Sequence, residues 1–140
     1  MTVAFDLEGT EPLDGSLDMI ETYYDLGVRT MLMAYNEPNR AGGGCHGDPE
    51  IGLTAFGQAV VREMNRIGML VDATHCSRRT TFDFFELSEA PVVFSHSVPA
   101  GLKKHPRNVG LGYSTDAIKG ILGGTSIEWQ TRSGARLRAK

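Results

Sequence analysis

Side chains that can bind a metal or take part in catalysis follow four short apolar segments of the chain. In chain order they are Glu8, Tyr35, Asn36, His75, Ser95 and His96. Imidazole nitrogen and carboxylate oxygen both suit zinc, so Glu8, His75 and His96 form a chemically sensible ligand set. A single histidine is more often a hydrogen-bonded core residue. Two histidines and a glutamate that each follow an apolar segment favour a metal site instead.

The apolar segments must be strands that bring these residues together. They cover residues 2–7, 30–34, 69–73 and 91–94, and each is a nearly continuous apolar run. Such runs are typical of a parallel sheet that is covered on both faces. The carboxyl ends of parallel strands share one edge, where α/β enzymes collect their catalytic residues. The polar residues are therefore expected to converge at that edge.

Helical spacing follows three of the four segments. A helix is predicted over residues 16–26, with Gly27 as its stop. Thr54 is predicted to cap a second helix that Gly68 ends, and Ser77 to cap a third. Residues 36–52 are rich in Gly and Pro and predict a loop. The resulting order, β-α-β-loop-α-β-α-β, indicates an α/β protein with right-handed crossovers.

Composition excludes several classes of protein. A net charge of -3 argues against a nucleic-acid binder that works through bulk positive charge. No apolar run is long enough for a membrane span, and residues 1–12 lack the pattern of a signal peptide, so a cytoplasmic location is expected. Cys45 and Cys76 are too few for a disulfide framework and are interpreted as packing residues. The 140 residues are too few for a complete (β/α)8 barrel.

The charge balance changes near residue 109. Residues 110–140 hold five basic and two acidic residues, whereas residues 1–109 are acidic overall. The chain is therefore divided into a region of βα units over 1–109 and a shorter region over 110–140, whose basic end is expected to fray.

Seven blocks of sequence between residues 4 and 109 carry a resemblance to a known family. They are DLEG (6–9), GVR (27–29), GLTAFG (52–57), MNRIGMLVD (64–72), TH (74–75), PVVFSHS (91–97) and HPRN (105–108). Together they resemble the membrane (renal) dipeptidase family of zinc peptidases. The resemblance implies part of a (β/α)8 TIM barrel of the amidohydrolase type, incomplete in this chain.

The resemblance also implies roles for individual residues. In the family the glutamate that matches Glu8 bridges two Zn²⁺ ions, and the histidines that match His75 and His96 bind one of them. The arginine that matches Arg107 holds the carboxylate of a dipeptide substrate. Tyr35 stands where some members have a substrate-contacting histidine.

Two features depart from the family. No histidine precedes Glu8, so one zinc site lacks its His-x-Asp ligands. After residue 108 the similarity is short. Asp116 is the candidate for the catalytic proton-transfer residue, with Ser114 as an alternative occupant of that position.

Three functions follow from these observations. The first is a zinc-dependent dipeptidase, in a truncated form with weak or no activity. The second is a catalytically inactive metal-binding or scaffold module derived from the same family, which the missing ligands favour. The third is a metal-dependent phosphoesterase, which would need further His or Asp ligands near the N-terminus. Part of a barrel has open strand edges, so association into a homo-oligomer is expected.

Overall fold

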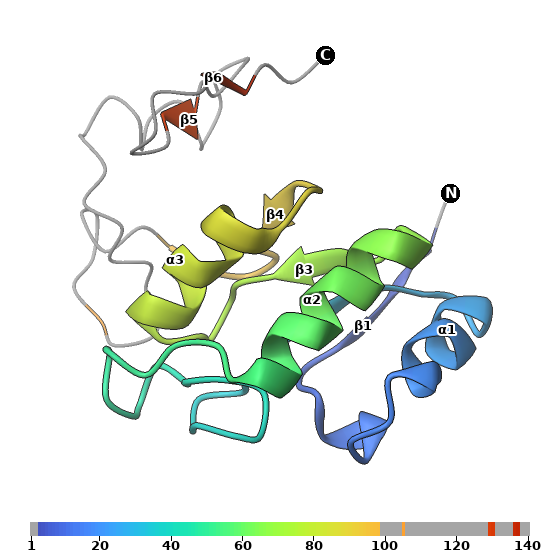
Figure 1. The fold of residues 1–140 in the computed structure, drawn as a ribbon, viewed down its shortest axis with the longest axis horizontal. Helices are drawn as coiled ribbons and strands as arrows, with labels where there is room; N and C mark the ends of the chain where they lie inside the picture. Colours follow the sequence, from blue (N-terminus) through green and yellow to red (C-terminus); the bar gives the residue numbers. More distant parts are fainter. Residues whose placement is uncertain (1–2, 99–104, 106–128, 131–135, 138–140) are drawn as a thin grey trace.

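A four-stranded parallel sheet forms the centre of the molecule (Figure 1). The computed structural model describes residues 3–98, 105, 129–130 and 136–137. The sheet has the order β1-β2-β3-β4. Its strands are β1 (Phe5–Leu7), β2 (Val28–Leu32), β3 (Leu70–Asp72) and β4 (Val92–Val93). Every predicted strand is confirmed; β1 ends at the predicted residue, whereas β2, β3 and β4 end before the apolar runs that predicted them.

Helices connect these strands in the predicted order. They are the 3-10 turn η1 (Glu11–Leu13) and the helices α1 (Asp18–Asp25), α2 (Ala55–Ile67) and α3 (Arg78–Leu87). α2 lies over β3, and α1 and α3 flank α2 (Figure 1). A separate antiparallel pair is formed by β5 (Trp129–Gln130) and β6 (Arg136–Leu137).

The helix boundaries follow the predicted capping residues. The Thr54 side chain accepts a hydrogen bond from the Gly57 N–H, at 3.1 Å, at the start of α2. The Ser77 hydroxyl accepts one from the Thr80 N–H, at 3.0 Å, at the start of α3. Gly68 ends α2 in a left-handed conformation, with φ of 84°. Each cap gives a partner to a backbone group that the helix leaves unpaired.

The hydrophobic core lies between the sheet and the helices. Val60 and Met64 of α2 are fully buried in one cluster with Met31 of β2 and Val71 of β3. Burying a side chain of this size contributes about 1.5–3 kcal/mol. This layer keeps the strands in register, and the register in turn places the polar residues that follow them.

In the described residues the helices lie over one face of the sheet (Figure 1), and the expected cover of the other face stays a prediction. Phe5 and Asp6 of β1 are exposed. On the face away from the helices the Thr30 hydroxyl donates a hydrogen bond to Asp6 Oδ1, at 2.7 Å. The reason is topological, because right-handed crossovers between neighbouring parallel strands all place their helices on the same side.

The loop predicted over residues 36–52 is confirmed and folds against the carboxyl edge of the sheet. Gly44 forms an isolated bridge with Cys76, and the Cys45 N–H donates to the His75 carbonyl at 2.8 Å. The Ser77 N–H donates to the Gly43 carbonyl, also at 2.8 Å. The loop therefore packs directly against the segment that carries His75.

The predicted division at residues 109 and 110 lies outside the described residues and stays a prediction. Among the residues that the structure describes, no helix is both long and apolar enough to cross a membrane.

Candidate functional site

Two histidines face each other at the carboxyl edge of the sheet. His75 follows β3 and His96 follows β4, and their Nε2 atoms are 2.9 Å apart. His75 is 7% exposed, whereas the His96 side chain is 43% exposed. The pair therefore has one buried member and one member open to solvent, as expected of a site that a small molecule can reach.

Glu8 and Tyr35 lie beside this pair. Glu8 follows β1, and its Oε1 atom is 3.7 Å from His96 Nε2. The Tyr35 ring is tilted against the His75 ring, with 4.4 Å between the ring centroids. The structure thus brings together the four site residues predicted within its described part, as the shared edge of parallel strands requires.

The remaining ring nitrogens of the two histidines have polar partners. His75 Nδ1 is 2.8 Å from Asn36 Oδ1, and His96 Nδ1 is 2.7 Å from Ser95 Oγ. The Ser95 hydroxyl donates a short hydrogen bond to the Asp72 carboxylate. Asn36 and Ser95 were noted in the sequence as polar residues at strand ends, but no role was predicted for them.

Asp72 was missed by sequence reasoning. It is fully buried, and its carboxylate accepts hydrogen bonds from the Thr74 hydroxyl at 2.6 Å and the Thr74 N–H at 2.9 Å. A carboxylate is almost never fully buried without partners. An aspartate at the end of an otherwise apolar strand is the signal that could have drawn attention to it.

Two residues of the site have left-handed backbone conformations. Asn36 has φ of 62° and His75 has φ of 63°. Positive φ is uncommon for residues other than glycine, although asparagine and histidine tolerate it better than most. Such conformations cluster at functional sites, where the surrounding structure holds them in place. Here the His46 N–H donates to the Asn36 carbonyl, and the Cys45 N–H donates to the His75 carbonyl.

The donor types fit zinc, but the ligand set is incomplete. Two nitrogens bound to one zinc at about 2.1 Å each lie roughly 3.4 Å apart in a tetrahedral site, whereas His75 Nε2 and His96 Nε2 are 2.9 Å apart. Glu8 adds a carboxylate on the same side. As the side chains lie within residues 3–98 and the few later ones described, however, no three or more of His, Cys, Asp or Glu are arranged as a complete metal site.

Electrostatics distinguish the remaining polar groups near the site. Burial raises the pKa of the Cys76 thiol to about 12, which makes it a packing residue rather than a reactive thiolate. Partial burial also raises the pKa of the Asp6 carboxyl, and the nearby Asp72 and Glu8 charges add to this effect. His46 lies apart from the pair and faces Glu37, at 3.5 Å.

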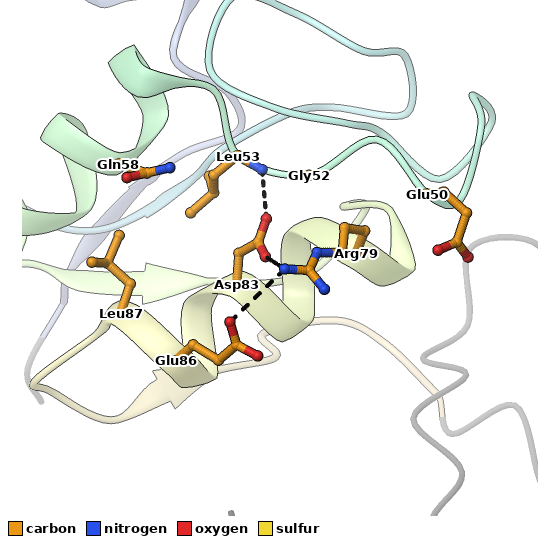
Figure 2. A pocket seen from close by; sticks show the side chains of 8 residues that line it. All are labelled: Glu50, Gly52, Leu53, Gln58, Arg79, Asp83, Glu86 and Leu87. Atoms are coloured by element: carbon orange, nitrogen blue, oxygen red, sulfur yellow. Dashed lines mark hydrogen bonds and ion pairs between the residues drawn. The ribbon is translucent and has the colours of Figure 1, made fainter. Parts of the chain in front are cut away.

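The pocket between α2 and α3 is a separate feature (Figure 2). It encloses about 460 Å³, and Arg79 lies within it, 2.8 Å from Asp83 and 3.8 Å from Glu86. Asp83 also accepts a hydrogen bond from the Leu53 N–H, at 2.8 Å. These contacts tie α3 to the start of α2. The lining includes none of the candidate site residues at the strand ends.

Arg107 and Asp116, with its alternative Ser114, lie outside the described residues. Their predicted roles in substrate binding and proton transfer stay predictions.

Comparison with known proteins identifies related sequences. The family model described as membrane dipeptidase (peptidase family M19) matches residues 1–110. An uncharacterised dipeptidase of Schizosaccharomyces pombe is 41% identical over 113 residues, which cover 78% of this chain and 27% of the relative. Dipeptidase tcpJ of Claviceps purpurea is 37% identical over 129 residues, which cover 89% of this chain and 30% of the relative.

Solved structures share the fold of this chain over part of their length. An amidohydrolase from Pseudomonas aeruginosa matches with a TM-score of 0.70 and 36% identity, over 74% of this chain and 31% of that chain. A metallopeptidase from Rhodobacter sphaeroides, liganded with a phosphinate mimic of the dipeptide L-Ala-D-Ala, matches with a TM-score of 0.69 and 29% identity. That match covers 76% of this chain and 32% of the other. The chain thus spans between about a quarter and a third of the length of these relatives.

Proposed function

The chain belongs to the membrane dipeptidase family, peptidase family M19, and from that premise we propose that it carries part of the active site of a zinc-dependent dipeptidase. The observation that supports this proposal is the convergence of His75 Nε2 and His96 Nε2 to 2.9 Å at the carboxyl edge of the sheet. Because the chain spans about a third of its relatives or less, the activity of a whole protein is part of the proposal.

In this proposal His75, His96 and Glu8 hold zinc. When bound, zinc polarises a substrate carbonyl and lowers the pKa of a coordinated water toward neutrality. The three residues come from three different strands, so the sheet itself positions them. Residues 1–7 hold no histidine, so the proposal assigns zinc donors only to Glu8, His75 and His96.

The substrate would lie on the open side of the histidine pair. Tyr35 is 42% exposed and stacks beside His75, where it can contact a bound dipeptide. The Rhodobacter relative was solved with a dipeptide mimic, which supports dipeptides as the substrate class. Arg107 is the candidate for the substrate carboxylate, because its planar guanidinium matches a carboxylate in two hydrogen bonds. Asp116 is the candidate for proton transfer.

Zinc content tests this assignment directly. We expect about one zinc per chain in the purified, size-fractionated protein, since a single set of donors converges. His75→Ala and His96→Ala should each abolish zinc binding, as measured by elemental analysis. His46→Ala is the matched control and should retain zinc. Unchanged zinc in both site variants would show that the ligands lie elsewhere.

Hydrolysis is the second measurement. We expect weak or no cleavage of dipeptides by these 140 residues, because they hold no match to the family's His-x-Asp ligands before Glu8. Rapid cleavage that a chelator stops would contradict this expectation about the chain while supporting the assignment of the family activity. Zinc binding with no cleavage by a version that restores the missing His-x-Asp strand would instead support an inactive metal-binding module.

A further inference from the structure

The tautomers of His75 and His96 are set by their neighbours. A neutral imidazole carries one proton, on either Nδ1 or Nε2, and the hydrogen bond at one nitrogen decides the state of the other. The Nε2 atoms of the two rings are 2.9 Å apart. Which nitrogen carries the proton therefore determines whether these two atoms present lone pairs to each other.

Asn36 sets the tautomer of His75. The Asn36 Oδ1 atom lies 2.8 Å from His75 Nδ1, and an amide oxygen can only accept a hydrogen bond. The same oxygen accepts a weaker contact from the Cys45 thiol, at 3.5 Å. His75 Nδ1 therefore carries the proton and donates it to Asn36, which leaves a lone pair on Nε2.

Asp72 and Ser95 set the tautomer of His96 in two steps. The Ser95 hydroxyl donates its single proton to the Asp72 carboxylate, which can only accept. The Ser95 oxygen must then accept at its contact with His96 Nδ1, at 2.7 Å. His96 Nδ1 carries the proton, and its Nε2 also has a lone pair.

We propose that Asn36 and the Asp72–Ser95 pair are positioning residues that hold both imidazoles as Nδ1–H tautomers, so that their two Nε2 lone pairs converge on one cation. This inference rests on the zinc site proposed above and adds the residues that fix the tautomers of its two histidines. With both rings in this tautomer neither Nε2 atom can donate to the other across 2.9 Å, and a cation between them would accept both lone pairs. Partners of this kind orient metal-binding histidines and make them better ligands.

The backbone around Asn36 supports this role. Asn36 has a left-handed conformation, and its carbonyl accepts a hydrogen bond from the His46 N–H at 2.8 Å. Gly44 packs so closely on the Asn36 carbonyl group that a Cβ atom there would overlap it. The loop 36–52 therefore holds Asn36 in the one conformation that directs its amide toward His75.

The first test is the tautomeric state itself, which needs neither zinc nor activity. Imidazole ¹⁵N NMR of the metal-free full chain, at a pH where the spectra show both rings neutral, reports which nitrogen is protonated. We expect Nδ1–H at both His75 and His96. An Nε2–H state at either ring would overturn the proposal for that ring.

Asp72→Asn is the most specific variant. The two Thr74 hydrogen bonds need an acceptor, so the new amide must keep its oxygen toward Thr74 and turn its NH₂ group toward Ser95. Ser95 would then donate to His96 Nδ1, and His96 would change to the Nε2–H tautomer. We expect that change in the ¹⁵N spectrum, and an unchanged His96 tautomer would contradict the proposed relay.

Asn36 is tested by a pair of variants. Asn36→Gly keeps the left-handed backbone and removes the amide, and it should lower zinc affinity by about 10–100-fold. Asn36→Asp retains an acceptor oxygen and should keep both the His75 tautomer and the affinity. Asn65→Gly, on α2, removes a similar set of hydrogen bonds to Ser88 and Glu89 and should leave zinc affinity unchanged.

The outcomes separate the two proposals. If the tautomers are as expected but the unmodified chain takes up no zinc, the zinc function fails while the positioning role stands. If zinc binds to the unmodified chain and to Asn36→Gly equally well, with the same His75 tautomer, the positioning role of Asn36 is overturned while the zinc site stands.

Discussion

Thr74 and Asp72 illustrate how single side chains hold the site together. Asp72 ends β3, and its carboxylate accepts hydrogen bonds from Thr74 and from Ser95, which follows β4. The buried carboxylate thus joins the two segments that carry the histidines. Hydrogen bonds to a charged group contribute about 1.5–3 kcal/mol each. The loss of one donor is therefore expected to be measurable in the free energy of unfolding.

Thr74→Val tests this contribution without touching either histidine. The side chain is 2% exposed, and valine has nearly the same shape. We expect the free energy of unfolding to fall by about 1–3 kcal/mol, because one hydrogen bond to Asp72 is lost. Urea unfolding measures the effect. Thr22→Val, on the exposed side of α1, is the control and should change stability by less than about 0.5 kcal/mol. Equal effects would show that Asp72 does not depend on Thr74.

At the scale of elements, the loop 36–52 behaves as a structural unit although it contains no helix or strand. The Asn39 amide donates to the Met33 carbonyl at 2.8 Å, and its Oδ1 atom accepts from the Ala41 and Gly42 N–H groups. The far end of the loop is attached to α3 through Asp83 and the Leu53 N–H. The loop therefore connects α2 and α3 to the residues that contact His75.

Gly44→Ala tests the packing of this loop on Asn36. A Cβ atom at residue 44 would overlap backbone atoms of Asn36, which cannot rotate away as a side chain could. We expect a loss of about 1–3 kcal/mol in stability, as overpacked sites show, together with weaker zinc binding. At Gly42 the nearest atom to an added Cβ is a Thr80 side-chain oxygen at 3.1 Å, so Gly42→Ala should cost less. The prediction would be wrong if the two variants were equally stable.

Thr54→Ala tests the cap of α2, the helix with the most residues in the core layer. Its hydroxyl accepts from the Gly57 N–H and donates to the Arg40 carbonyl at 2.7 Å. Loss of such a cap costs about 0.5–2 kcal/mol. Thermal or urea unfolding should show this decrease, whereas Thr22→Ala on the surface of α1 should leave stability nearly unchanged. A loss below about 0.3 kcal/mol would mean that the cap contributes little.

At the scale of the whole molecule, the chain is part of an α/β barrel of the amidohydrolase type. Among the described strands, β1 and β4 lie at the edges of the four-stranded sheet. Val3, Phe5 and Leu26 near the β1 edge are 64%, 60% and 69% exposed. An open edge with apolar side chains is a common site of association between chains.

Phe5→Lys is expected to reduce self-association. A charge on an edge strand disfavours strand pairing between copies, and Phe5 is exposed enough that the change should cost little stability. Sedimentation velocity over a range of protein concentrations measures the effect. Phe82→Lys, on α3, changes another exposed phenylalanine away from this edge and serves as the control. If both variants associate as the unmodified chain does, the β1 edge is not the contact surface.

Much of the architecture could be read from local patterns. Thr54, Ser77 and Gly68 predicted the helix boundaries correctly, because a cap acts on backbone groups within a few residues of itself. Strand order and the convergence of Glu8, His75 and His96 followed from parallel βα topology, which places every strand's carboxyl end at one edge.

The details that prepare the site depend on contacts between residues distant in the sequence. Asn36 and His75 are 39 residues apart, and Asp72 and Ser95 are 23 apart. No periodicity or spacing encodes which nitrogen of His75 meets Asn36, nor that Gly44 packs on the Asn36 backbone. The amino-acid order therefore sufficed for the elements and the candidate ligands, whose causes are local or topological. The orientation and tautomer of the two imidazole rings are decided only once the elements pack, because side chains from separate segments then become each other's hydrogen-bond partners.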